Sequence, residues 1–116
     1  MGFMDAVKMC FSKYVDFEGR AQRSEYWWFA LFSLLGALVF SVLDAGLGIF
    51  ALEPLFSLGI LLPSIAVGVR RLHDIDRTGW WLLIGLVPLI GFLVLIYFFV
   101  NKGTDGPNRF GNDPLA

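Results

Sequence analysis

The chain has 116 residues, which is enough for one domain and no more. Hydrophobic residues make up 57% of it and charged residues 16%, well below the roughly 25% charge of a typical soluble domain. The net charge of −1 argues against a nucleic-acid partner, and the single cysteine, Cys10, excludes an internal disulfide and a four-cysteine metal site.

Residues 1–18 carry an amphipathic helical pattern. Phe3, Val7, Cys10 and Phe11 recur at helical spacing on one face, and most of the charged side chains fall on the other face. The pattern predicts an N-terminal helix that lies in the plane of the lipid headgroups. The same pattern also suits an ordinary amphipathic helix that packs on protein.

Three long stretches without charged side chains follow, at 26–43, 54–69 and 78–101. About 20 apolar residues in a helix cross the roughly 30 Å hydrocarbon core of a bilayer. A small soluble domain has too little interior to bury so much apolar surface. We therefore predict an all-α membrane protein, with residues 1–116 forming a single integral domain. The predicted transmembrane helices are 26–44, 53–73 and 79–101, followed by an irregular, loop-like tail at 102–116.

The first predicted span carries a stripe of small residues. Ser33, Ala37, Ser41 and Ala45 recur every four residues along one face. Because lipid provides no hydrophobic drive for helix association, small side chains that let backbones approach are typical of packing seams. The stripe is a candidate seam, either within the protein or between copies of it.

The third predicted span contains a break at "LVPLIG", where Pro88 and Gly91 disfavour a straight helix. One interpretation is a bent transmembrane helix. The alternative is a re-entrant hairpin with this sequence at its tip.

The basic residues predict the orientation of the chain. Seven of the nine Lys and Arg residues lie in the N-terminal segment and the 70–79 loop, and the connection at 44–53 has none. The positive-inside rule then places the N-terminus and this loop in the cytoplasm. Three spans put the tail outside, whereas the hairpin alternative puts both termini in the cytoplasm, so the side of the tail stays open.

Charge concentrates in "RRLHDIDRTGWW", residues 70–81. If the second helix continues past the bilayer, Arg70, His73, Asp74 and Arg77 share one of its faces. The predicted topology brings "GRAQRSEYWW", residues 19–28, to the same interface. The predicted binding cluster is Arg20, Arg23, Glu25, Trp27, Trp28, Arg70, Arg71, His73, Asp74, Arg77, Trp80 and Trp81.

Several functions fit this cluster. Arginines at span ends orient a membrane protein, carboxylates neutralise them, and tryptophans anchor at the interface. The arginines also suit capture of an anionic lipid headgroup or of a partner membrane protein. Enzymatic acid–base work on a headgroup by His73 and Asp74 is a weaker alternative, because no nucleophile accompanies them. A small-solute transporter or channel component is a further alternative, which requires an oligomer because three plain helices enclose no polar path.

The residues favour a non-enzymatic binding or organising protein in the bilayer. Neither a cofactor nor a metal is expected, since His73, Asp74 and Asp76 are the only nearby hard or imidazole ligands.

Four motifs give the chain a family resemblance: "FEGRAQRSEYWWF", "RRLHDIDRTGWWLL", "VPLIG" and "KGTDGPNRFGNDP". In their order and spacing the chain resembles the bacterial inner-membrane family known as domain of unknown function 805, over about residues 3–114. The resemblance implies a small multi-pass protein of the bacterial cytoplasmic membrane and supplies no activity. It marks Gly19, Arg20, Arg23, Glu25, Tyr26, Trp27, Trp28, Arg71, Leu72, His73, Asp74, Arg77, Gly79, Trp80, Trp81, Gly103, Gly106, Asn108, Arg109 and Gly111.

Overall fold

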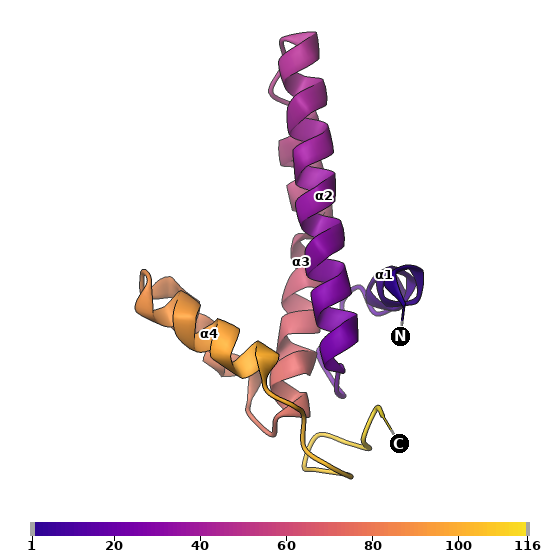
Figure 1. Cartoon of the computed structure of the whole chain (residues 1–116), viewed down its shortest axis with the longest axis vertical. Helices are drawn as coiled ribbons and strands as arrows, with labels where there is room; N and C mark the ends of the chain where they lie inside the picture. Colours follow the sequence, from indigo (N-terminus) through magenta and orange to yellow (C-terminus); the bar gives the residue numbers. More distant parts are fainter. Residues whose placement is uncertain (1, 116) are drawn as a thin grey trace.

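The computed structural model describes residues 2–115 of the chain. Over these residues the secondary structure is entirely helical and contains no strand, which confirms the all-α prediction. The molecule is elongated, with a longest dimension of 50 Å (Figure 1). Its elements are α1 (Phe3–Ser12), α2 (Arg23–Leu47), α3 (Leu52–Asp74), the 3-10 helix η1 (Gly79–Leu86) and α4 (Ile90–Val100).

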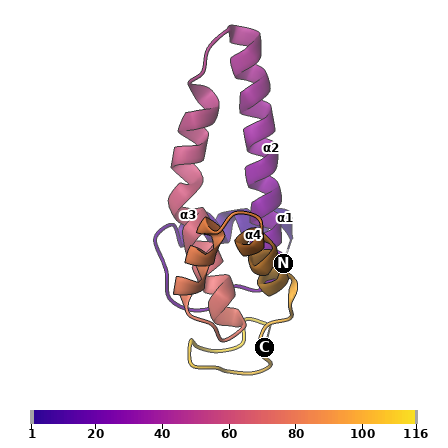
Figure 2. The same cartoon turned by 90° about the vertical axis from the view of Figure 1, so that its left-hand side faces the viewer.

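Helices α2 and α3 form an antiparallel pair that sets the length of the molecule (Figure 2). Each is long and apolar enough to cross a membrane, yet only 6% of the apolar window of α2 and 22% of that of α3 is buried in the protein. A core helix of a soluble protein is mostly buried, so this exposed apolar surface suits lipid instead. The two helices correspond to the spans predicted at 26–44 and 53–73.

Helices α2 and α3 are in close contact at Gly36, where the ring of Phe56 lies against the α2 backbone. A Cβ atom at Gly36 would come within 2.2 Å of that ring. The predicted small-residue stripe lies beside this contact, with Ser33 and Ala37 half-buried and its last two members exposed. The seam inside the protein therefore uses glycine against an aromatic ring, and the stripe is only partly covered.

The connection between α2 and α3 is fixed by Asp44. Its buried carboxylate accepts hydrogen bonds of 3.0 Å from the backbone N–H groups of Leu52 and Glu53, at the start of α3. These groups have no partner within the helix, so Asp44 acts as its cap. Gly48 ends α2 with a φ of +69°, a left-handed conformation that glycine adopts without strain.

The single third helix predicted for 79–101 is not formed. The segment consists of η1 and α4, which are joined by residues 87–89 and folded back on each other as a hairpin. Pro88 lies in the turn, and Gly91 lets α4 pass close to η1, because a Cβ atom there would be 1.7 Å from the carbonyl oxygen of Ile84. The break that the sequence shows at "LVPLIG" is therefore the turn of this hairpin.

The hairpin starts at the end of the α2–α3 pair where α2 begins and α3 ends, and it slants away from the pair. It does not reach the half of the pair that holds the α2–α3 connection (Figures 1 and 2). The chain enters and leaves the hairpin at the same place. There the backbone N–H of Thr104, just after α4, donates to the carbonyl oxygen of Asp74, at the end of α3, at 2.7 Å. The tail has no helix over its described residues, which agrees with the irregular tail predicted for 102–116.

Helix α1 lies across the lower part of α2 and on the side opposite the hairpin (Figure 1). It ends at Ser12, before the end predicted at residue 18. Phe3 packs edge-on against Trp28, and Phe11 against Phe29, each with ring centroids 5.8 Å apart. The apolar face predicted from the sequence is thus the face that packs on protein.

Candidate functional site

The charged residues of the two central motifs meet at the lower end of the α2–α3 pair, around Asp74. One carboxylate oxygen of Asp74 accepts from Arg20 at 3.0 Å, and the other accepts from Arg71 at 2.6 Å. All three side chains are at most 4% exposed. Residues 19–28 lie beside residues 70–81, as predicted, and the structure shows that the ion pairs between them are buried.

Arg20 ties the tail to this end of the protein. Besides Asp74, its guanidinium donates to the backbone carbonyl oxygens of Thr104 at 2.6 Å, Gly106 at 2.7 Å and Gly111 at 3.3 Å. A buried cation is tolerated when hydrogen bonds replace the water it has lost. The tail carbonyls provide that replacement, and Arg20 has little left to offer a ligand.

The C-terminal end of α4 is held by three side chains from α2 and α3. Arg71 and the indole of Trp27 donate to the carbonyl oxygen of Phe99, at 3.3 and 3.1 Å, and Arg23 donates to that of Val100 at 3.1 Å. Carbonyls in the last turn have no helical partner and carry the negative end of the helix dipole. Cationic side chains from neighbouring helices therefore complete α4, which has no basic residue in its own last turn.

The tail in turn completes the C-terminal end of α3. The side-chain amide of Asn108 donates to the carbonyl oxygen of His73 at 2.9 Å. Arg109 pairs with the exposed Asp76 at 3.1 Å. Gly103 passes so close to Asp74 that a Cβ atom would lie 2.1 Å from its carboxylate. Gly103 thus serves a close backbone approach to the charged cluster, whereas a Cβ atom at Gly106 or Gly111 would meet nothing within 4 Å.

A second buried ion pair lies beneath α1. The guanidinium of Arg70 pairs with Glu25, and the Cys10 thiol lies 3.8 Å from the same carboxylate oxygen. Among the described residues, no hydrogen-bond partner is found for Nε and Nη2 of Arg70. Burial, reinforced by the charge of Glu25, raises the pKa of Cys10 to about 12, so this thiol is unreactive at neutral pH.

His73 and Asp74, the weak catalytic candidates, do not form a pair. Nδ1 of His73 lies 2.8 Å from the carbonyl oxygen of Gly19. Because a carbonyl only accepts, Nδ1 carries the proton. The ring stacks on Phe110 with centroids 4.0 Å apart. Both oxygens of Asp74 are occupied by arginines, so the geometry provides no acid–base pair here.

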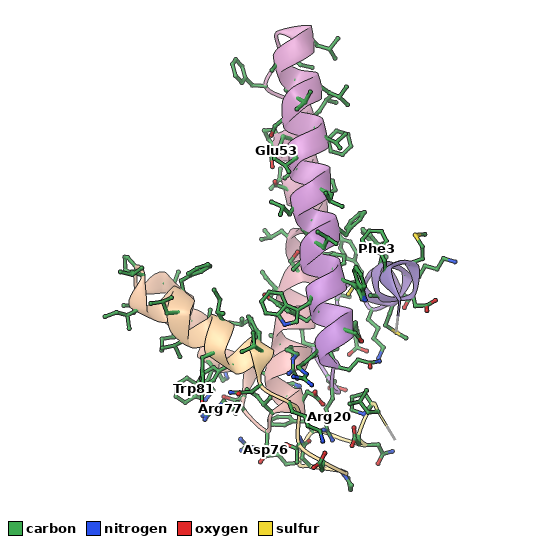
Figure 3. All side chains as sticks on the ribbon, in the orientation of Figure 1. Phe3, Arg20, Glu53, Asp76, Arg77 and Trp81 are labelled. Carbon is green, nitrogen blue, oxygen red and sulfur yellow. The ribbon has the colours of Figure 1, made fainter. Side chains whose placement is uncertain are left out.

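The remaining predicted residues lie nearer the surface. The guanidinium carbon of Arg77 lies 5.2 Å from the centroid of Trp81, and Trp80 is 78% exposed. Figure 3 shows Arg77 and Trp81 below the hairpin, with Arg20 and Asp76 nearby. Within residues 2–115 no group of His, Cys, Asp and Glu is arranged to hold a metal.

Two buried arginines, Arg20 and Arg71, together with the carboxylate of Asp74, join the loop before α2, the ends of α3 and α4, and the tail. We call this cluster the clasp. Sequence reasoning identified the arginines and carboxylates but missed the tail carbonyls and the Asp44 cap. Any residue type can supply a backbone carbonyl, so the sequence does not mark these groups; the available signal was Gly103, which lets the tail approach Asp74.

A family model described as "Protein of unknown function (DUF805)" matches residues 14–112 of the chain. The chain belongs to this family. This confirms the resemblance found in the motifs, and the match covers both halves of the clasp.

Relatives in the family come from Escherichia coli. "Inner membrane protein YhaI" of strain K12 is 48% identical over 103 residues, which cover 87% of each chain. "Inner membrane protein YhaH" of the same strain is 43% identical over 117 aligned positions, covering 96% of this chain and 97% of the relative. "Uncharacterized protein YiiR" is 34% identical over 132 positions, covering 84% and 85%. No solved structure matches the chain.

Two of these names place relatives in the inner membrane. Together with the exposed apolar surface of α2 and α3, they support the predicted membrane location of this DUF805 protein.

Proposed function

We propose that this protein is a non-enzymatic, multi-pass protein of the bacterial cytoplasmic membrane that binds anionic phospholipid headgroups at the cytoplasmic face. One observation carries the proposal. All nine Lys and Arg residues belong to segments in the lower half of the molecule, around the clasp, and the connection at 44–53 has none (Figure 2). The positive-inside rule assigns such an end to the cytoplasm, where the leaflet surface is negative.

The same charge distribution supports a topology with two spans. In it, α2 and α3 cross the membrane, and the η1–α4 hairpin enters and leaves from the cytoplasmic side. Helix α4 has 11 residues, a length of about 16 Å, which falls short of the roughly 30 Å hydrocarbon core. Both termini are then cytoplasmic, as in the hairpin alternative.

In this arrangement α1 and the hairpin occupy the inner leaflet on opposite sides of the α2–α3 pair. The outer surface of α4 is apolar and exposed, with Phe92 61% and Leu93 55% exposed. Helix α1 presents its charged face outward, as expected for a helix at headgroup depth.

The lipid contacts come from the outer basic residues and not from the buried ones. The guanidinium groups of Arg20 and Arg71 already donate hydrogen bonds to protein oxygens within the clasp. A variant that replaces them is expected to unfold and is no test of lipid binding. The basic residues that make these contacts are Lys8, Arg23, Arg77 and Lys102, whereas Arg109 is paired with Asp76 and takes no part.

Quenching of tryptophan fluorescence tests the proposal, because all four tryptophans follow charged segments at the clasp end. The purified protein is reconstituted with brominated phosphatidylglycerol or brominated phosphatidylcholine. We expect phosphatidylglycerol to associate about fivefold more strongly, which corresponds to about 1 kcal/mol from a basic residue near the surface. The preference should shrink at high salt because surface charges are screened. Equal quenching by the two lipids at low salt would remove the proposal.

A further inference from the structure

Arg77 differs from the other five arginines of the chain. Each of those donates a hydrogen bond to a protein oxygen, whereas within residues 2–115 none is found for Arg77. Its guanidinium carbon lies 4.4 Å from the ring centroid of Phe98 and 5.2 Å from that of Trp81. The neighbouring Asp76 pairs with Arg109 instead. Two aromatic rings therefore hold the cation in place while its hydrogen-bond donors stay unused.

The same side chain lines a pocket of about 480 Å³ at the base of the hairpin. The lining residues are Ile75, Arg77, Tyr97, Phe98, Asn101, Lys102 and Thr104. They include two cations, two hydroxyl groups and one amide, and no carboxylate. Lys102 is 61% exposed and pairs with Asp105, which lies outside the lining. The lining itself thus presents positive charge and hydrogen-bond donors, and the carboxylate paired with Lys102, on Asp105, is on a side chain that is 82% exposed.

These groups match the chemistry of a phosphate. A guanidinium presents parallel N–H donors in a fork that fits two phosphate oxygens, and an ammonium adds a point charge. The volume lies in the range of ordinary small-ligand sites. Tyr97, which lines the pocket, and Leu93 one turn before it are 62% and 55% exposed on the apolar outer surface of α4. When the phosphate of a ligand lies in the pocket, the apolar outer surface of α4 lies next to it and is available to the hydrocarbon part of the same ligand.

We propose that Arg77, Lys102 and Thr104 bind the phosphate of an anionic phospholipid of the cytoplasmic leaflet. The proposal rests on the proposed function and names its binding site. The headgroup phosphate sits in the pocket, and an acyl chain lies along α4. This site fixes one lipid in a defined place, in addition to the general attraction of the basic surface.

Native mass spectrometry of the detergent-solubilised protein tests the site by counting bound lipids during titration. Arg77→Gln is expected to weaken binding of phosphatidylglycerol about tenfold or more, because a charged hydrogen-bonding partner is lost. Arg109→Gln is the matched control, since it removes the same charge at the same end from a residue outside the pocket. We expect that control to change the affinity less than about twofold, as an exposed ion pair contributes little.

The outcomes separate the site from the function. If the wild-type protein holds phosphatidylglycerol no better than phosphatidylcholine, the site and the proposed function both fail. If the wild type prefers phosphatidylglycerol and Arg77→Gln keeps that affinity, the site is overturned and the function stands. Displacement of the lipid by excess inorganic phosphate would overturn the lipid assignment in favour of a soluble phosphate. Arg77→Lys, which keeps the charge and loses the fork, is expected to bind with intermediate affinity.

Discussion

Replacing Asp74 with asparagine is expected to lower the free energy of unfolding by about 3–5 kcal/mol. Asparagine keeps the shape of the side chain but removes the charge shared by Arg20 and Arg71. Both guanidinium groups are at most 1% exposed, so water cannot take the place of the lost carboxylate. The tail is expected to detach first, because Arg20 joins it to Asp74. Titration of the purified protein with sodium dodecyl sulfate, followed by tryptophan fluorescence, measures the change.

Asp76→Asn is the control for this substitution. It removes the same charge two residues away, where the Asp76–Arg109 pair has side chains 47% and 58% exposed. Asp76 has a φ of +61°, and asparagine tolerates this left-handed conformation as aspartate does. The expected loss is about 0–1 kcal/mol. If the two variants unfolded at the same detergent concentration, the clasp would not be the element that stabilises the fold.

Gly91→Ala is expected to open the hairpin and destabilise the protein by about 1–3 kcal/mol. The added Cβ would lie 1.7 Å from the carbonyl oxygen of Ile84 and 3.2 Å from the Cα of Gly85. Both are backbone atoms of η1, so no side-chain rotation relieves the overlap and the two helices must separate. The same detergent titration measures the loss.

Gly46→Ala provides the comparison in α2. A Cβ there meets nothing within 4 Å, and alanine in a helix interior is favoured over glycine by about 0.5–1 kcal/mol. This variant is therefore expected to be as stable as the wild type or slightly more so. A Gly91→Ala protein as stable as Gly46→Ala would show that η1 and α4 do not pack as described.

The two long helices were readable from the sequence because hydropathy and length alone decide them. The segment 79–101 was not, since apolar residues contribute equally whether they cross a membrane once or turn back within it. The information that decides between the two is local. It lies in Pro88 and Gly91, of which one cannot continue a helix and the other permits backbone contact. The effect of these two residues depends on the packing of η1 against α4, which overall hydropathy does not describe.

The site was predictable in its members and not in its burial. Spacing brings Arg71, Asp74 and Arg20 together, but spacing does not reveal whether an arginine faces lipid headgroups or protein carbonyls. That choice depends on the tail, whose backbone oxygens surround Arg20. Arg77 appeared equivalent to its neighbours in the sequence, and only its aromatic cradle and missing partner set it apart.

In the proposed topology the clasp, the open end of the η1–α4 hairpin and both termini lie on the cytoplasmic side. Cysteine labelling tests it, starting from Cys10→Ser to remove the native thiol. Phe50→Cys and Leu115→Cys then place single thiols at positions that are 94% and 62% exposed, in the α2–α3 connection and in the tail. A maleimide that cannot cross the inner membrane is expected to label Phe50→Cys in cells with an intact inner membrane, and Leu115→Cys only after that membrane is opened. Labelling of Leu115→Cys while the inner membrane is intact would contradict the account.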